Sequence, residues 1–114
     1  MFKFERLEVW HKSIALYEEI ALISQSIHQR DQYSLGEQIR RASLSISTNI
    51  AEGTGRASQK ESRFFYNVAK GSVYEVISLL HVCKKQGYVR DEQFQKLYFQ
   101  CDEIARMITG LMKR

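Results

Sequence analysis

The chain of 114 residues contains no proline, only two cysteines and no long apolar run. β-Sandwich and loop-rich folds usually need some proline, whereas uninterrupted helices do not. No apolar stretch approaches the roughly 20 residues that a membrane-spanning helix requires. Residues 1–6 lack the pattern of a signal peptide. These absences favour a helical protein of the cytoplasm.

The two cysteines, Cys83 and Cys101, fall in different predicted helices. Two widely spaced cysteines form no metal-binding motif. In a reducing compartment both are expected to be small core residues. The alternatives are a disulfide in the purified protein or a redox role.

Composition and length predict one folded domain over residues 1–114. Hydrophobic residues make up 44% of the chain, which is within the globular range and enough for one core. The net charge of +4 comes from the second half, because residues 58–114 hold ten basic and six acidic residues. This excess permits a nucleic-acid or acidic protein partner without requiring one.

Apolar residues recur at steps of three and four, which predicts four amphipathic helices over residues 7–27, 34–53, 58–87 and 91–114. The first stripe is expected to run through Leu7, Trp10, Ile14, Tyr17, Ile20 or Ala21, Ser24 and Ile27. The second is expected to contain Leu35, Ile39, Ala42, Ile46 and Ile50. The third is expected to contain Phe65, Val68, Ser72, Val76, Leu80 and Cys83, widened by Phe64, Val73 and Ile77. The fourth is expected to contain Phe94, Leu97, Tyr98, Cys101, Ile104, Ala105, Ile108 and Leu111. Four such helices with short connections predict an all-α, up-down-up-down four-helix bundle.

Polar residues mark the predicted helix starts. Ser34 with Glu37, and Ser58 with Glu61, have the spacing of capping boxes, and Asp91 is a favourable N-cap. Glycines are expected to end the second helix at Gly53 and Gly55, and the third at Gly87.

The second and third helices also carry small and polar residues at helical spacing, which predict a polar seam. Its predicted members are Gln38, Arg41, Ser45, Asn49, Glu52, Ser72 and Glu75. One interpretation is a seam between helices or subunits that fixes their register. The other is a binding groove.

An antiparallel arrangement of these two helices predicts specific neighbours. Arg41 should lie near Gly71 and form an ion pair with Glu75. Two further pairs are expected: Asn49 near Arg63, and Glu52 near Lys60. The small residues Ala42, Ser45, Gly71 and Ser72 are expected to let the two backbones approach closely.

Three segments of these helices stand out together: Leu35-Gly36-Glu37-Gln38-Ile39-Arg40-Arg41-Ala42, Ser45-Ile46-Ser47-Thr48-Asn49-Ile50-Ala51-Glu52-Gly53 and Ala69-Lys70-Gly71-Ser72-Val73-Tyr74-Glu75. With Leu7-Glu8-Val9-Trp10 and Gly87-Tyr88, they resemble the signature of four-helix-bundle proteins encoded in intervening sequences of bacterial 23S ribosomal RNA genes. The resemblance covers nearly the whole chain. It implies an up-down bundle that assembles as a ring, a homopentamer, with no known catalysis and a suspected association with nucleic acid. A related branch comprises the accessory variability proteins of diversity-generating retroelements, pentameric basic bundles that bind nucleic acid and a reverse transcriptase.

Basic residues at the helix ends are candidate contacts to RNA or DNA. The candidates are Arg40, Arg56, Lys60, Arg63, Lys70, Lys84, Lys85 and Arg90. One cluster is expected at the turn between the second and third helices, and another at the opposite end of the bundle. A charge of +4 per subunit would become about +20 in a pentamer, enough for sequence-tolerant, salt-dependent binding to phosphates. The alternative is that these are solvated charges on helix ends.

No catalytic residue, cofactor or metal site is predicted. Glu8 and His11 have the Glu-x-x-His spacing of a di-iron bundle, but no second such motif exists. The glycines Gly53 and Gly55 lack the lysine and strand of a phosphate-binding loop. His81 and Cys83 point apart on a helix, so they form no nucleophile pair.

A protein-interaction adaptor without direct nucleic-acid contact is the alternative function. Its partner would be, for example, a reverse transcriptase or an RNA-processing enzyme. Four aromatic side chains partly off the core stripes favour such a surface: Phe64, Tyr66, Tyr74 and Phe99. Burial in a subunit interface would explain them equally well.

Overall fold

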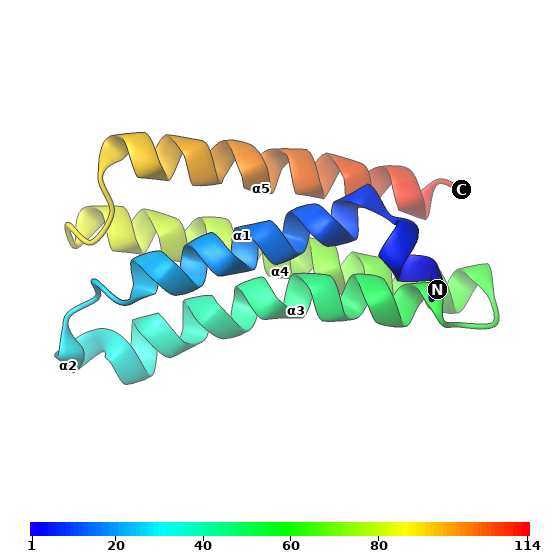
Figure 1. The fold of residues 1–114 in the computed structure, drawn as a ribbon, viewed down its shortest axis with the longest axis horizontal. Coiled ribbons are helices and arrows are strands. Elements are labelled where there is room, and N and C mark those ends of the chain that lie inside the picture. The colour runs from blue at the N-terminus through cyan, green and yellow to red at the C-terminus, as the bar shows by residue number, and fades with distance from the viewer.

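Four long helices run alternately up and down in the computed structural model, which describes all 114 residues (Figure 1). They are α1 (Glu8–Ser24), α3 (Glu37–Thr54), α4 (Gln59–Lys85) and α5 (Asp91–Met112). Both termini and the α3–α4 turn lie at one end of the bundle (Figure 1). The predicted all-α, up-down-up-down four-helix bundle is confirmed.

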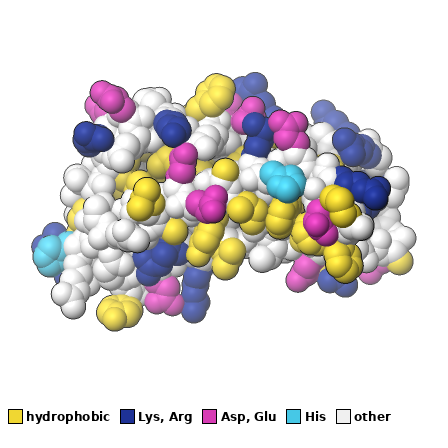
Figure 2. All heavy atoms as spheres, viewed as in Figure 1, with side chains coloured by type: hydrophobic (Ala, Val, Ile, Leu, Met, Phe, Trp, Pro, Cys, Tyr) yellow, Lys and Arg dark blue, Asp and Glu magenta, His cyan; other side chains and the backbone are white.

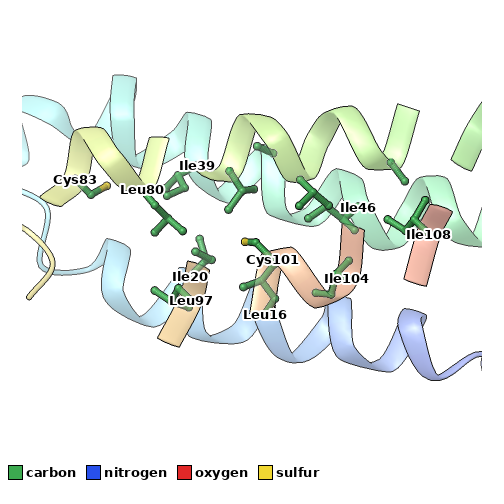
Figure 3. Packing of buried hydrophobic residues seen from close by; sticks show 14 of the residues in the cluster. Leu16, Ile20, Ile39, Ile46, Leu80, Cys83, Leu97, Cys101, Ile104 and Ile108 are labelled. Carbon is green, nitrogen blue, oxygen red and sulfur yellow. The ribbon is translucent and has the colours of Figure 1, made fainter. Parts of the chain in front are cut away.

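Side chains from all four helices fill one core of 20 buried hydrophobic residues. Figure 3 shows Leu16 and Ile20 of α1 facing Leu97 and Cys101 of α5 across this core. The helices do not contact one another equally, because α1 packs more extensively on α3 than on α5. The side of the bundle between α1 and α5 is therefore its most open side.

The core stripe of α1 differs from the predicted one. Its buried residues are Val9, Ser13, Leu16, Ile20 and Ser24, whereas the expected Trp10, Ile14 and Tyr17 are only half-buried. Two serines occupy core positions because their hydroxyls bond back to the helix: Ser13 Oγ donates to the carbonyl three residues earlier at 2.6 Å, and Ser24 Oγ does so at 2.8 Å. These polar residues interrupt the true stripe, so the sequence pattern favoured the neighbouring face.

The second helix begins earlier than predicted, and the Ser34 capping box is wrong. The chain is helical from α2 (Gln29–Asp31) through a π-helical turn, η2 (Gln32–Gly36), into α3. The Ser34 hydroxyl donates to the Asp31 carbonyl at 3.3 Å. The side-chain amide of Gln32 donates to the carbonyls of Ser24 and Ile27, at 2.7 and 2.8 Å. This amide adds a second hydrogen bond to the Ser24 carbonyl, which also accepts from the Ile27 amide, and it provides a donor for the Ile27 carbonyl beyond the end of α1.

The other helix ends follow the predicted signals closely. Ser58 Oγ accepts from the Glu61 amide at 3.1 Å, so it caps α4 as expected. The N-cap of α5 is Arg90, one residue before the predicted Asp91. Gly87 adopts φ +79°, and the next amide, that of Tyr88, donates back to the Cys83 carbonyl at 2.9 Å. This is a Schellman ending, whose left-handed residue is usually glycine.

The first half of the α4 stripe is shifted by one residue. Tyr66 and Ala69 are buried, whereas the predicted Phe65 is half-buried and Val68 is exposed. Gly53 causes the shift, because its missing side chain leaves room for the Tyr66 ring.

None of the helices combines the length and the apolar composition that a membrane span requires.

Candidate nucleic-acid interface

Polar side chains connect α3 to α4 along the predicted seam. Ser45 Oγ and Ser72 Oγ lie 2.9 Å apart and share a hydrogen bond. Asn49 Nδ2 donates to the Ser45 hydroxyl at 2.9 Å and to the Ser45 carbonyl at 2.8 Å. Nearer the other end, Gln38 Nε2 donates to Glu75 Oε2 at 3.2 Å. The structure thus brings five of the seven predicted seam residues together between the helices.

The remaining two seam residues pair with neighbours in sequence, and the predicted Arg41–Glu75 ion pair is wrong. Arg41 Nη2 lies 3.0 Å from Glu37 Oε1, one turn earlier. Glu75 instead accepts a hydrogen bond from Gln38. Glu52 forms its ion pair with Arg56, at 3.3 Å, and not with Lys60.

We expect Arg41→Ala to change stability little. The Arg41 side chain is 80% exposed, and its one carboxylate partner is an (i, i+4) neighbour. Such surface pairs contribute less than about 0.5 kcal/mol to the free energy of unfolding. Thermal unfolding followed by circular dichroism measures the effect. A fall of several degrees in Tm would instead support the Arg41–Glu75 pair.

The predicted register is wrong near the α3–α4 turn. Gly53 lies against Tyr66, and the first turns of α4 run past the end of α3 (Figure 1). Arg63 therefore does not meet Asn49. Its Nε donates to the Met112 carbonyl of α5 at 3.1 Å. Gly71, expected to permit close packing, has open space where a Cβ would lie.

The basic cluster predicted at this turn consists of Arg56, Lys60 and Arg63, and some of it is engaged in contacts within the protein. Arg56 lies over the Phe65 ring at 4.3 Å and pairs with Glu52. Arg63 Nε donates to the Met112 carbonyl, and its Nη2 donates to Gln59 Oε1. The other N–H groups of this guanidinium are unused, because it has five in all. Lys60 is exposed and pairs with no carboxylate. Two of the three predicted residues therefore offer positive charge to a ligand.

The second predicted cluster, at the opposite end, is partly neutralised. Lys84 Nζ lies 3.2 Å from Asp91 Oδ1 and 4.6 Å from the centre of the Phe94 ring. Lys85 and Arg90 are exposed and form no ion pair. Acidic residues adjoin them, because Asp91 and Glu92 directly follow Arg90.

The two other candidates, Arg40 and Lys70, lie outside both clusters, and Arg40 is hydrogen-bonded within the protein. Arg40 Nη1 donates to Ser24 Oγ at 3.2 Å and to Gln32 Oε1 at 3.1 Å. It therefore helps Gln32 close the end of α1, which the sequence did not predict. Lys70 is half-buried on α4 and forms no ion pair.

Basic residues from both chain ends join the turn cluster, and the sequence pattern did not predict them. Lys3 and Arg6 belong to the short helix η1 (Lys3–Arg6), and Lys113 and Arg114 follow α5. We define the turn-end surface by its seven basic residues: Lys3, Arg6, Arg56, Lys60, Arg63, Lys113 and Arg114. Figure 2 shows Lys and Arg side chains at this end, beside exposed hydrophobic ones. Only the up-down topology reveals the grouping, because its members come from three segments that lie far apart in sequence.

Four carboxylates lie on the same segments. Glu52 pairs with Arg56, and Glu8 approaches Lys12 at 3.7 Å. Glu5 accepts from the Phe2 amide at 3.0 Å, and Glu61 accepts from the Ser58 hydroxyl at 3.0 Å, and both keep their negative charge. Because seven basic residues outnumber these four carboxylates, the turn-end surface has a net positive charge.

Three of the four predicted surface aromatics are exposed. Phe64 and Tyr74 on α4 are each 63% exposed, and Phe99 on α5 is 68% exposed. Tyr66 is the exception, because it is buried against Gly53. Large exposed aromatic side chains mark an interaction surface where they form one contiguous patch.

Both cysteines are buried in the core, as predicted, and are free thiols. Removal from water disfavours the thiolate. Burial raises the pKa of Cys83 to about 11 and that of Cys101 to about 12. Neither thiol is ionised near neutral pH, so neither has the properties of a nucleophile there.

These pKa shifts predict a loss of stability in mild alkali. Both thiols stay protonated in the folded protein, whereas those of the unfolded chain ionise near their ordinary pKa of 9.0. The unfolded state therefore gains stability as pH rises through 9, and we expect the free energy of unfolding to fall by about 1.5 kcal/mol between pH 8 and pH 9.5. Urea unfolding at both pH values measures this. Cys101→Ala should reduce the fall by about half, and an unchanged pH dependence in that variant would contradict the cause.

The side chains considered as metal ligands or nucleophiles, Glu8, His11, His81 and Cys83, do not come together in one site. His11 Nε2 lies 2.7 Å from the Glu5 carbonyl, and Glu8 is directed to Lys12. No group of three or more His, Cys, Asp and Glu side chains is placed to hold a metal ion. His81 is exposed against the Phe94 ring, with centroids 4.8 Å apart, whereas Cys83 points into the core.

Comparisons with known proteins agree with this architecture. The sequence model for the 23S rRNA-intervening sequence protein family matches residues 5–110. One similar crystal structure is that of a protein of unknown function from the S23 ribosomal protein family of Bacteroides thetaiotaomicron. It is 21% identical with a TM-score of 0.85, and the alignment covers 93% of this chain and 99% of that one. At this identity the likeness shows the fold alone. No curated protein matches the chain.

Proposed function

Because the chain belongs to the 23S rRNA-intervening sequence protein family, we propose that it is a non-enzymatic, homo-oligomeric protein that binds nucleic acid through its turn-end surface. The observation that carries this proposal is the convergence of seven of the 17 basic residues at one end of the bundle. Lys3, Lys60 and Arg63 form no ion pair there. Unpaired cations on an exposed surface bind phosphate backbones and release counterions, so binding should be salt-dependent and tolerant of sequence.

The binding test compares two triple variants. The first, Arg56→Gln, Lys60→Gln and Arg63→Gln, removes three charges from the turn-end surface. The control, Arg41→Gln, Lys96→Gln and Arg106→Gln, removes three charges that pair with carboxylates on other surfaces. Net charge is therefore the same in both variants, and only its location differs.

Fluorescence anisotropy with a single-stranded RNA across a salt series gives the readout. The turn-end variant should bind more weakly, and the slope of log K against log salt should become shallower by about 1.4, which is about 0.7 for each of the two unpaired cations that it removes, Lys60 and Arg63. The control should stay close to the wild type. Circular dichroism checks that both remain folded. Wild-type binding by the turn-end variant at every salt concentration would reject the proposal.

The homo-oligomer is supported by large hydrophobic side chains left exposed on a single chain. Phe64, Tyr74 and Phe99 are each more than 60% exposed. Burial between copies in a closed ring would cover such residues. We expect a pentamer, so five subunits of 13.4 kDa should give a particle of about 67 kDa by light scattering. A mass of one subunit at micromolar concentration would contradict it.

The exposed aromatics also favour a second candidate function, a protein adaptor for a reverse transcriptase or an RNA-processing enzyme. In that case partner binding would depend on Phe64, Tyr74 and Phe99 rather than on the basic residues. RNA binding by the wild type distinguishes the functions, because an adaptor would leave RNA unbound in the wild type and in both triple variants.

A further inference from the structure

A small pocket opens on the turn-end surface where three segments of the chain meet. Its volume is about 130 Å³, which is room for several water molecules. The lining comes from η1 and the start of α1, from the α3–α4 turn region, and from the end of α5. Its lining includes Lys3, Gln59, Arg63, Tyr66 and Arg114.

The charged side chains that line this pocket are all basic. Lys3, Arg63 and Arg114 line it, no Asp or Glu does, and none of the three forms an ion pair with a carboxylate. Arg63 is also held in place, because its Nε bonds to the Met112 carbonyl and one Nη2 bond goes to Gln59. Its remaining N–H groups keep the planar geometry that suits a phosphate.

A tyrosine hydroxyl in the same pocket lacks a protein partner. Tyr66 lines the pocket, with its ring held against Gly53. Most of the side chain is buried, but its hydroxyl is accessible to solvent and hydrogen-bonds to no protein group. A phenol hydroxyl can donate one hydrogen bond. The Tyr66 hydroxyl is therefore available to donate to water or to a ligand in the pocket.

We propose that this pocket binds the terminal phosphate of a nucleic-acid strand. A phosphate monoester at a strand end carries about −1.5 to −2 charges at neutral pH, whereas an internal phosphodiester carries one. Three unpaired cations around a small concave site favour the group of higher charge. The concave shape also favours a strand end over a backbone that must pass through. The inference rests on the proposed nucleic-acid binding and adds to it a preference for strand ends.

The test compares one single-stranded RNA with a 5′-phosphate, with a 3′-phosphate and with hydroxyls at both ends. We expect a phosphorylated end to tighten binding by about tenfold, the gain of one or two charge-assisted hydrogen bonds. Tyr66→Phe keeps the ring against Gly53 and removes only the hydroxyl, so it should reduce the preference. Arg63→Gln should abolish it. Arg106→Gln, whose side chain is exposed and pairs with Asp102, is the matched control and should keep it.

The outcomes separate this inference from the proposed function. Equal binding of all three RNAs by the wild type overturns the terminal-phosphate site and leaves backbone binding intact. Binding of none of them overturns both. In a further arm, inorganic phosphate is titrated while the amide signals of Lys3 and Tyr66 are followed by NMR. A response to inorganic phosphate without any preference among the RNAs would identify a site for the free ion and overturn the assignment to strand ends.

Discussion

Replacing Leu16 by alanine is expected to lower the free energy of unfolding by about 2–5 kcal/mol. Leu16 is fully buried in α1 and faces Leu97 and Cys101 across the core (Figure 3). The truncation removes apolar contacts and leaves a cavity that the surrounding helices fill only in part. Urea unfolding monitored by circular dichroism measures the change.

Leu22→Ala is the matched control, because it is the same substitution in the same helix at a site that is 66% exposed. It should alter stability by no more than about 0.5 kcal/mol. The comparison also tests the corrected face of α1, since the predicted stripe ran through Ile14 and Tyr17 instead. A larger loss from Ile14→Ala than from Leu16→Ala would restore the predicted face.

Gly53→Ala is expected to destabilise the protein by about 1–3 kcal/mol, the usual cost of overpacking a buried site. A Cβ at this position would lie 2.4 Å from Cε1 of the Tyr66 ring. The ring would have to move, and it also lines the pocket on the turn-end surface. Stability to urea gives the size of the effect, and loss of the end preference in RNA binding gives its consequence.

Gly71→Ala is the control for this substitution, and it is expected to raise the free energy of unfolding rather than lower it. Gly71 lies within α4, and nothing is within 4 Å of the place where its Cβ would lie. Alanine is favoured over glycine in a helix interior, so this substitution should stabilise the protein by about 0.5–1 kcal/mol. Destabilisation by Gly71→Ala would mean that this surface is covered, for instance by another subunit.

The sequence was sufficient to predict the four helices and their antiparallel order. Stripes such as Ile39, Ala42, Ile46 and Ile50 have a regular helical period, and short connections leave few other arrangements. The pattern was misleading where a core position is polar or where two helices meet at a small residue. Ser13 is a polar residue at a buried position of α1, so the apolar pattern pointed to the neighbouring face. Gly53 leaves room for the Tyr66 ring in the core, which the pattern of α4 did not indicate.

Less of the candidate site was predictable. Helical spacing placed Ser45, Asn49 and Ser72 on facing surfaces, because residues three and four apart share a face. It did not specify which side chain reaches Glu75, since that depends on helix offset and side-chain length. The pocket could not be predicted, because Lys3, Arg63 and Arg114 come together only when the bundle is assembled.

The unequal packing of α1 has a consequence for the order in which the bundle forms. The α3–α4 pair is joined by a four-residue turn and has the most extensive contact of any pair, so closing it loses little chain entropy. The contact between α1 and α5 joins the most distant helices in sequence and is sparse. We expect amide hydrogen exchange to be slowest in α3 and α4 and fastest in α1, and the reverse order would contradict this hierarchy. The first helix would then be the part of the folded bundle that opens most readily without unfolding the rest.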